Sequence, residues 1–224
     1  MYFVPLSACF PFSKNNCMSK PIRWVLLAGV FVILFYFLKD SILSDSSYVA
    51  GIRKERREKN LTFRGSTGSP LEDADRNSFD SLHYYAPDII YRVEADYKVF
   101  PRPDTVQMPM TTGETEPYLK FAQASFTLEG QRHSLFLYLK VNTTDSLLFV
   151  PFNDKTNGSE TYAGGRFLDV PMPEKDARLI TLDFNNAYNP FCVYNYNYSC
   201  PVPPRANRLA ILLRAGEKDY AKNN

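Results

Sequence analysis

The longest apolar stretch of the chain runs from Trp24 to Leu38 and contains no charged side chain. As a helix it would extend about 22 Å, less than the hydrocarbon core of about 30 Å. A longer helix over residues 22–43 can cross this core when the side chains of Arg23 and Lys39 extend toward the headgroups. We therefore expect residues 22–43 to form a transmembrane signal-anchor, through which the chain binds the membrane. A cleaved signal peptide is the alternative, although no A-x-A-like cleavage site follows the run.

The charges beside the apolar run predict its orientation. Lys20 and Arg23 precede it, which favours a cytoplasmic tail over residues 1–21. The flank that follows, KDSILSD, carries no net positive charge, so we expect the large C-terminal domain in the periplasm of a bacterial cell. Met18 opens MSKPIRW, a natural signal-anchor start, and residues 1–17 are then an upstream extension outside the protein.

Residues 44–64 are rich in charge and predict a short helix, with Ser and Asp available to cap its start. We interpret this helix as a solvated stalk, with contact between its basic residues and anionic lipid as the alternative. The segment GSTGSP at 65–70 has the composition of a turn and marks the start of the next domain.

From residue 65 onward, short apolar stretches alternate with Gly- and Pro-rich turns. Expected strands cover residues 89–99, 105–110, 120–128, 131–141, 146–152, 166–170, 178–184 and 208–215. Pro101 and Pro103 end the first of these, and Glu129-Gly130 forms the clearest hairpin turn. This pattern predicts an all-β domain over 65–218, an antiparallel sandwich or barrel-like fold, followed by a tail at 219–224.

The composition and the motifs of the sequence exclude several classes of function. With 26 Lys and Arg against 24 Asp and Glu, the net charge of +2 argues against a nucleic-acid binder. His83 and His133 are the only histidines in the sequence, so a site of three imidazoles is excluded, and we expect both to be structural. The chain contains no G-x-S-x-G, H-E-x-x-H, G-x-x-x-x-G-K-[ST] or G-x-G-x-x-G motif.

Two polar segments could carry chemistry. In FNDKTNGSETYAGGRFLD, Gly164-Gly165 could form an anion-binding nest beside the guanidinium of Arg166. The alternative is a plain turn with Arg166 paired to Asp169 or Glu160. In LDFNNAYNPFC, Asp183 and Asn185 share one side of a strand and could orient a polar ligand, or could equally satisfy the backbone of the following loop.

The third segment is CVYNYNYSCPVPP, in which seven residues separate Cys192 from Cys200. In an exported domain this spacing favours a disulfide, for which the chain-entropy model gives about 2.5 kcal/mol. A metal site and a reactive thiolate are the alternatives; we expect no metal or other cofactor. The tyrosines and asparagines between the cysteines suit a recognition surface, or a stapled hairpin packed on itself.

Together these segments resemble the domain of unknown function 1684 family from about Arg53 to Lys218. The motifs that carry the resemblance are GSPL, FVPFNDKTNGSETYAGGRFLD, LDFNNAYNPFC, CPVPP, NRL and AGEK. The family has no established activity, so the resemblance implies a shared domain without a reaction. The resemblance also implies that members that look cytosolic keep both cysteines, which weakens the disulfide interpretation and gives thiol or metal chemistry somewhat more weight. The family's motif positions fall on Asp154, Thr156, Glu160, Tyr162, Arg166, Asp183, Asn185, Asn189, Cys192, Cys200, Asn207 and Glu217.

The sequence supports three hypotheses. In the first, an anchored extracytoplasmic domain binds a small ligand or an envelope protein partner beside the Cys192–Cys200 loop. Its ligand-binding residues would be Asp154, Glu160, Tyr162, Arg166, Asp183, Asn185 and Asn189. In the second, the domain is a hydrolase that uses two carboxylates drawn from Glu160, Asp183 and Glu217. In the third, the domain is a structural accessory subunit of a membrane complex.

Overall fold

The computed structural model describes residues 20–65, 67–141 and 146–220. The chain divides into two compact units, Met1–Asp45 and Ser46–Asn224, and the second contains all the strands described below. The helices and strands are α1 (Lys20–Arg64), α2 (Asp73–Ser78), β1 (Arg92–Pro109), β2 (Thr115–Leu128), β3 (Gln131–Lys140), β4 (Leu147–Phe152), β5 (Arg166–Pro171) and β6 (Leu179–Asp183). Single-turn 3₁₀ helices lie at Ile89–Tyr91, Phe184–Asn186, Phe191–Val193 and Arg205–Asn207.

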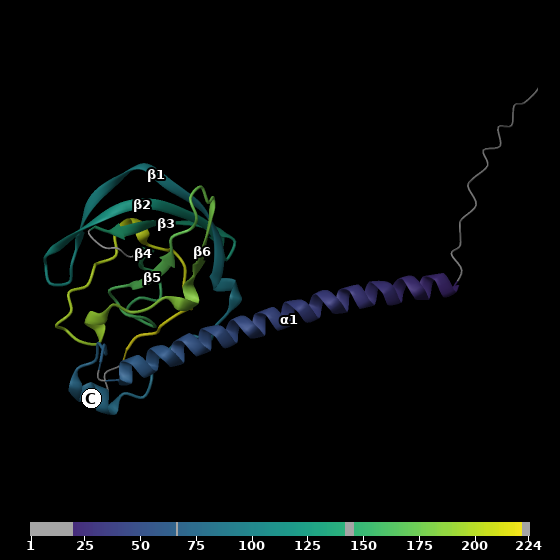
Figure 1. The fold of residues 1–224 in the computed structure, drawn as a ribbon, viewed down its shortest axis with the longest axis horizontal. Helices are drawn as coiled ribbons and strands as arrows, with labels where there is room; N and C mark the ends of the chain where they lie inside the picture. The colour runs from purple at the N-terminus through teal and green to yellow at the C-terminus, as the bar shows by residue number, and fades with distance from the viewer. Residues whose placement is uncertain (1–19, 66, 142–145, 221–224) are drawn as a thin grey trace, which may run out of the picture. The chain divides into compact units, whose positions relative to one another are not determined.

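The six strands form one antiparallel sheet in the order β5-β4-β3-β2-β1-β6. The sheet is curled, and β1, β2 and β3 arch beside β4 and β5 in Figure 1. The expected hairpin is confirmed: Leu128 pairs with Gln131 across a two-residue turn. Both turn residues have positive φ, 51° at Glu129 and 72° at Gly130, as the hairpin's right-handed twist requires. The all-β antiparallel prediction is therefore correct, and its form is a half-barrel.

The predicted end of the first strand at Pro101 and Pro103 is wrong. β1 continues through both prolines, and its register with β2 shifts between Val99 and Asp104. Proline has no N–H to donate to a sheet ladder, and the irregularity places both rings where regular pairing is interrupted. The stretches expected at 89–99 and 105–110 are thus largely one long strand, which begins at Arg92.

Residues 208–215 do not form the expected strand, although their alternation is correct. Leu209, Ile211 and Leu213 are buried and the residues between them are exposed. The segment joins the sheet's hydrophobic core, yet its backbone bonds mostly to the loop after β4, with Leu209 N–H donating to Asn153 O at 2.8 Å. Alternation of buried and exposed side chains therefore indicates extended backbone here, but it does not show that the segment is paired in the sheet.

The structure also differs from the prediction of a short, solvated charged helix over residues 44–64. This segment lies within α1, and from Ser46 onward it belongs to the same compact unit as the sheet. Ile52 and Phe63 are buried, at 4% and 3% exposure, and Phe63 packs edge-on against Tyr194 with ring centroids 4.9 Å apart. This part of α1 is packed on the β domain and is not a solvated stalk.

No helix within the described ranges is both long and apolar enough to cross a membrane. The anchor over residues 22–43 remains a prediction from the sequence. Of the expected tail at 1–21, residues 1–19 lie outside the described residues, as do residues 221–224 of the tail expected at 219–224.

Candidate functional site

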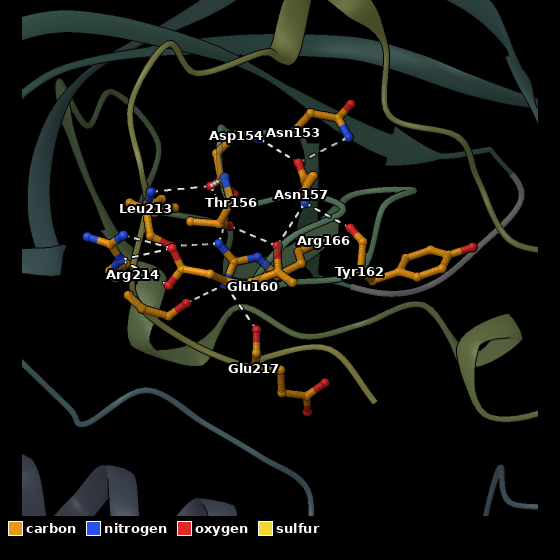
Figure 2. Close-up of polar contacts among 12 residues, drawn as sticks. Asn153, Asp154, Thr156, Asn157, Glu160, Tyr162, Arg166, Leu213, Arg214 and Glu217 are labelled. Atoms are coloured by element: carbon orange, nitrogen blue, oxygen red, sulfur yellow. Dashed lines mark hydrogen bonds and ion pairs between the residues drawn. The ribbon is translucent and has the colours of Figure 1, made fainter. Parts of the chain in front are cut away.

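Arg166 and Asp154 form an ion pair in the interior of the domain. Arg166 opens β5, Asp154 follows β4, and their Nη2 and Oδ2 atoms are 2.8 Å apart with neither side chain exposed. The same guanidinium donates to the backbone carbonyls of Leu213 at 2.8 Å, Glu217 at 3.1 Å and Ala215 (Figure 2). Arg166 thus holds the C-terminal segment in place, and because its guanidinium is enclosed and used internally, the structure gives no support to its predicted role in ligand binding. Its partner is also neither of the two acidic residues expected from the sequence.

The loop after β4 is organised by the other oxygen of Asp154. Its Oδ1 accepts hydrogen bonds from the backbone N–H and the hydroxyl of Thr156, at 2.8 and 2.6 Å. The hydroxyls of Thr156 and Thr161 lie 2.8 Å apart, and Asn157 donates to the carbonyl of Tyr162 at 2.9 Å. Asp154 and Thr156 are therefore structural, whereas the ring of Tyr162 points away from this network in Figure 2.

Gly165 has the positive φ expected of the Gly-Gly pair, at +97°. A Cβ there would lie 2.6 Å from Asn153 Nδ2 and 2.7 Å from Phe152 O. The glycine is required because the chain passes close to its own backbone, and no ligand is needed to explain it.

Glu160 forms a partly exposed ion pair with Arg214. The Arg214 Nη2 donates to Glu160 Oε1 at 2.8 Å and its Nε donates to Oε2 at 2.9 Å. Tyr85 adds a hydroxyl at 3.0 Å. The hydrogen bonds from Arg214 hold the pKa of Glu160 below its ordinary value, so this carboxylate is ionised and anchored.

Glu217 is buried, with 1% exposure, and is surrounded by donors. Its Oε1 accepts from Lys59 Nζ at 2.5 Å, and its Oε2 accepts from the Tyr194 hydroxyl at 2.6 Å and the backbone N–H of Asn189 at 2.8 Å. Burial and the nearby carboxylate raise the pKa of Tyr84 and Tyr194 far above the ordinary tyrosine value. Asn189 in turn donates to the carbonyl of Lys218 at 2.8 Å.

Asp183 ends β6, whereas Asn185 lies in the 3₁₀ turn Phe184–Asn186 that follows, so the two do not share one side of a strand as expected; both contact α1. Both carboxylate oxygens of Asp183 accept from the Tyr48 hydroxyl at 2.8 Å. The Asn185 amide donates to Tyr48 Oη at 2.8 Å and to the carbonyl of Asp88 at 2.7 Å, and its Oδ1 accepts from Asp88 N–H. Burial, followed by the bond to Asp183, raises the pKa of Tyr48. Of the two alternatives, the structure favours the one in which these residues satisfy neighbouring backbone.

A groove of about 500 Å³ opens beside the tyrosine-rich loop. Its walls include four aromatic side chains, the thiol of one cysteine, two threonines and one carboxylate. These residues are Tyr162, Tyr196, Tyr198, Tyr220, Cys192, Thr111, Thr112 and Asp219. This volume lies within the range of about 300–1,000 Å³ that is usual for ligand sites. A second hollow, beside Lys59 and Glu217, has only about 190 Å³. A third hollow, of about 540 Å³ beside Lys54 and Arg57, is as large, but its lining residues include no aromatic side chain, so the tyrosine-lined groove is the better candidate site.

Cys192 and Cys200 lie next to each other below this groove, and both are free thiols in the structure. The Cys192 backbone N–H donates to Cys200 Sγ at 3.2 Å. The thiol of Cys200, followed by the hydroxyls of Thr111 and Tyr162, lowers the pKa of Cys192 to about 7, and the same thiol contact raises the pKa of Cys200. The expected disulfide is not formed here, and the proximity of the two residues leaves it as a prediction for the oxidised protein. No group of three metal-ligating side chains is found in the described parts of the chain.

Sequence reasoning placed the functional residues together beside the Cys192–Cys200 loop, but of the predicted ligand-binding residues only Tyr162 lines the groove there. The three candidate catalytic carboxylates, Glu160, Asp183 and Glu217, are each held by a different set of donors. The partners Tyr48 and Lys59 were missed because the charged helix was interpreted as solvated. The spacing of Tyr48, Ile52, Lys59 and Phe63, which places them on one helical face, was the available signal.

The fold and the groove define a small half-barrel domain with a tyrosine-lined groove beside a thiol pair. Residues 77–218 match the model of the family described as "Protein of unknown function (DUF1684)", and the chain belongs to that family. It is similar to the solution NMR structure of an uncharacterized protein from Haloarcula marismortui, with 38% identity and a TM-score of 0.62. That similarity covers 77% of this chain and 95% of the archaeal chain. No curated protein matches this chain.

Proposed function

We propose that this domain binds a peptide segment, as part of an envelope protein partner, in the groove beside Cys192. The observation that carries the proposal is the concentration of tyrosine side chains around a hollow of about 500 Å³. Tyrosine rings provide large contact area with little conformational entropy to lose, and their hydroxyls can bond to a peptide backbone.

Other side chains pack against the residues that line the groove, which favours a binding surface that is already ordered before a ligand binds. Tyr220 packs edge-on against the buried Tyr194 with centroids 5.0 Å apart, and Tyr198 packs on Phe191 at 5.4 Å. Thr112 Oγ1 lies 2.8 Å from Ser199 Oγ, which links the loop to the end of β1 and its turn. A surface held in this way loses less entropy when a ligand is bound.

Hydrolysis by a carboxylate pair is less well supported. Glu217 is buried under Lys59 and Tyr194, and Glu160 is clamped by Arg214. A general acid or base must contact the proton it transfers, and the oxygens of both carboxylates already accept hydrogen bonds from these donors. Purely structural association with a membrane complex would not require a hollow of this size.

We further propose that the domain is held at the outer face of a bacterial cytoplasmic membrane by residues 22–43. The support is the apolar run from Trp24 to Leu38 with Arg23 and Lys39 at its ends. The full chain should stay in the membrane pellet after alkaline carbonate extraction. Val32→Arg should release it, because a central charge in a lipid-spanning helix costs about 2.5–3.5 kcal/mol. Release of the unaltered chain would refute the anchor.

The binding proposal can be tested by amide NMR with a mixed tetrapeptide library as the probe. Shifts should concentrate on Gly158, Thr112 and Asp219 and should be lost in Tyr196→Ala, whose side chain is 77% exposed. Met172→Ala, in a separate hollow of about 460 Å³, is the matched control and should bind normally. Shifts spread over the whole domain, or unchanged by Tyr196→Ala, would contradict the proposal.

A further inference from the structure

We propose that Cys192 and Cys200 are a thiol–disulfide exchange pair that acts on disulfide-bearing peptides held in the groove. The inference deepens the proposed binding function and rests on it for its substrate. Cys192 and Cys200 lie next to each other but differ in their position relative to the groove.

Cys192 lines the groove and has 8% exposure, whereas Cys200 has 4% exposure and is not one of the lining residues. Of the two, Cys192 is therefore the residue that borders the groove, and Cys200 is the more deeply buried. Exchange chemistry requires this arrangement, with an accessible attacking thiol and a second thiol close enough to resolve the intermediate.

The surroundings of Cys192 favour its thiolate. The thiol of Cys200, followed by the hydroxyls of Thr111 and Tyr162, lowers the pKa of Cys192. Thr111 is itself fixed, since its Oγ1 accepts from the Cys200 backbone N–H at 3.0 Å. Phe167 packs with both cysteines in one apolar cluster, which keeps the second sulfur dry and protonated until it is needed.

The reaction balances without another reagent. The Cys192 thiolate attacks one sulfur of a peptide disulfide, a Cys192–peptide disulfide forms, and the other half leaves as a thiolate that takes up a proton. Cys200 then loses its proton and attacks the Cys192 sulfur, which expels the first half as a thiol. The protein dithiol is oxidised to a disulfide, and the peptide disulfide is reduced to two thiols.

The test uses the full chain with Cys9→Ser and Cys17→Ser, reduced beforehand, and oxidised glutathione as the probe. We expect a product lighter by two hydrogens and two thiols released per chain. Cys200→Ser should stop with one glutathione bound at Cys192, and Cys192→Ser should react at least about tenfold more slowly. Limited oxidation of the chain with both cysteines present, followed by acid quenching and peptide mapping, should also place the first glutathione on Cys192, and this measurement needs no cysteine variant to fold.

Equal reaction of the two cysteines, or none, would overturn the proposal. So would a pair that is isolated oxidised and resists dithiothreitol in the folded state, because it would then be a structural disulfide. Tyr196→Ala should slow exchange with glutathione disulfide and leave exchange with 2-hydroxyethyl disulfide unchanged. If peptides bind and no exchange occurs, only the thiol chemistry fails. If exchange occurs and no peptide binds, the groove proposal fails instead.

Discussion

Asp154→Asn tests whether the buried ion pair is structural. The replacement keeps the size of the side chain and can keep an acceptor for Thr156, but it turns an N–H group toward the Arg166 guanidinium at the former 2.8 Å contact. Removing one partner of a buried pair leaves an uncompensated charge and typically costs about 3–5 kcal/mol. We expect a loss of that size, since neither side chain has any exposure.

The assay is urea unfolding at 25 °C followed by circular dichroism. Asp96→Asn is the matched control, because its 3.0 Å pair with Arg132 joins side chains that are 68% and 71% exposed. Such a surface pair contributes about 0–1 kcal/mol. A loss below about 1 kcal/mol for Asp154→Asn, similar to that of the control, would refute the structural role. Arg166→Met combined with Asp154→Asn should cost less than the sum of the two single changes.

Three further predictions concern other parts of the domain. Gly165→Ala should destabilise it by at least about 2 kcal/mol in the same assay, because φ is +97° and the new Cβ meets backbone at 2.7 Å; a neutral result would contradict this. Alkylation of Cys192 by iodoacetamide should rise through about pH 7, where its pKa lies, and a rise only near pH 8.5 would show an ordinary thiol. Stability should fall as pH rises above about 10, because the unfolded chain then loses the Tyr194 proton that the folded state keeps. Tyr194→Phe should flatten that slope and, by removing the bond to Glu217, cost about 1–3 kcal/mol at neutral pH.

The positions of most strands could be predicted from the sequence, but where a strand continues or pairs could not. Alternation and turn residues located the hairpin around Glu129-Gly130 because its geometry is set locally by two positive φ values. The passage of β1 through Pro101 could not be predicted locally, since it depends on the neighbouring strand's register. The alternation of residues 208–215 was equally unable to distinguish pairing with a sheet from packing inside it.

The candidate site shows a similar division. Composition correctly drew attention to Cys192, Cys200 and the tyrosines between them, which do line or underlie a groove. It could not separate Arg166 from that site, because a buried arginine and a ligand-binding arginine have the same neighbours in sequence. The difference lies in three carbonyls supplied from about fifty residues further along the chain.

Those carbonyls also bear on how the domain is made. Asp154 neutralises the charge of Arg166, but the carbonyls of Leu213 and Glu217 that complete its hydrogen bonds follow it by 47 and 51 residues. During synthesis, the strands would be translated first, and the guanidinium of Arg166 would still lack these carbonyl partners. Native structure would then form only after residues 213–217 have emerged, as expected of a topology dominated by distant contacts. Removing residues from about 213 onward should therefore yield a chain that fails to fold, and not a shorter stable domain.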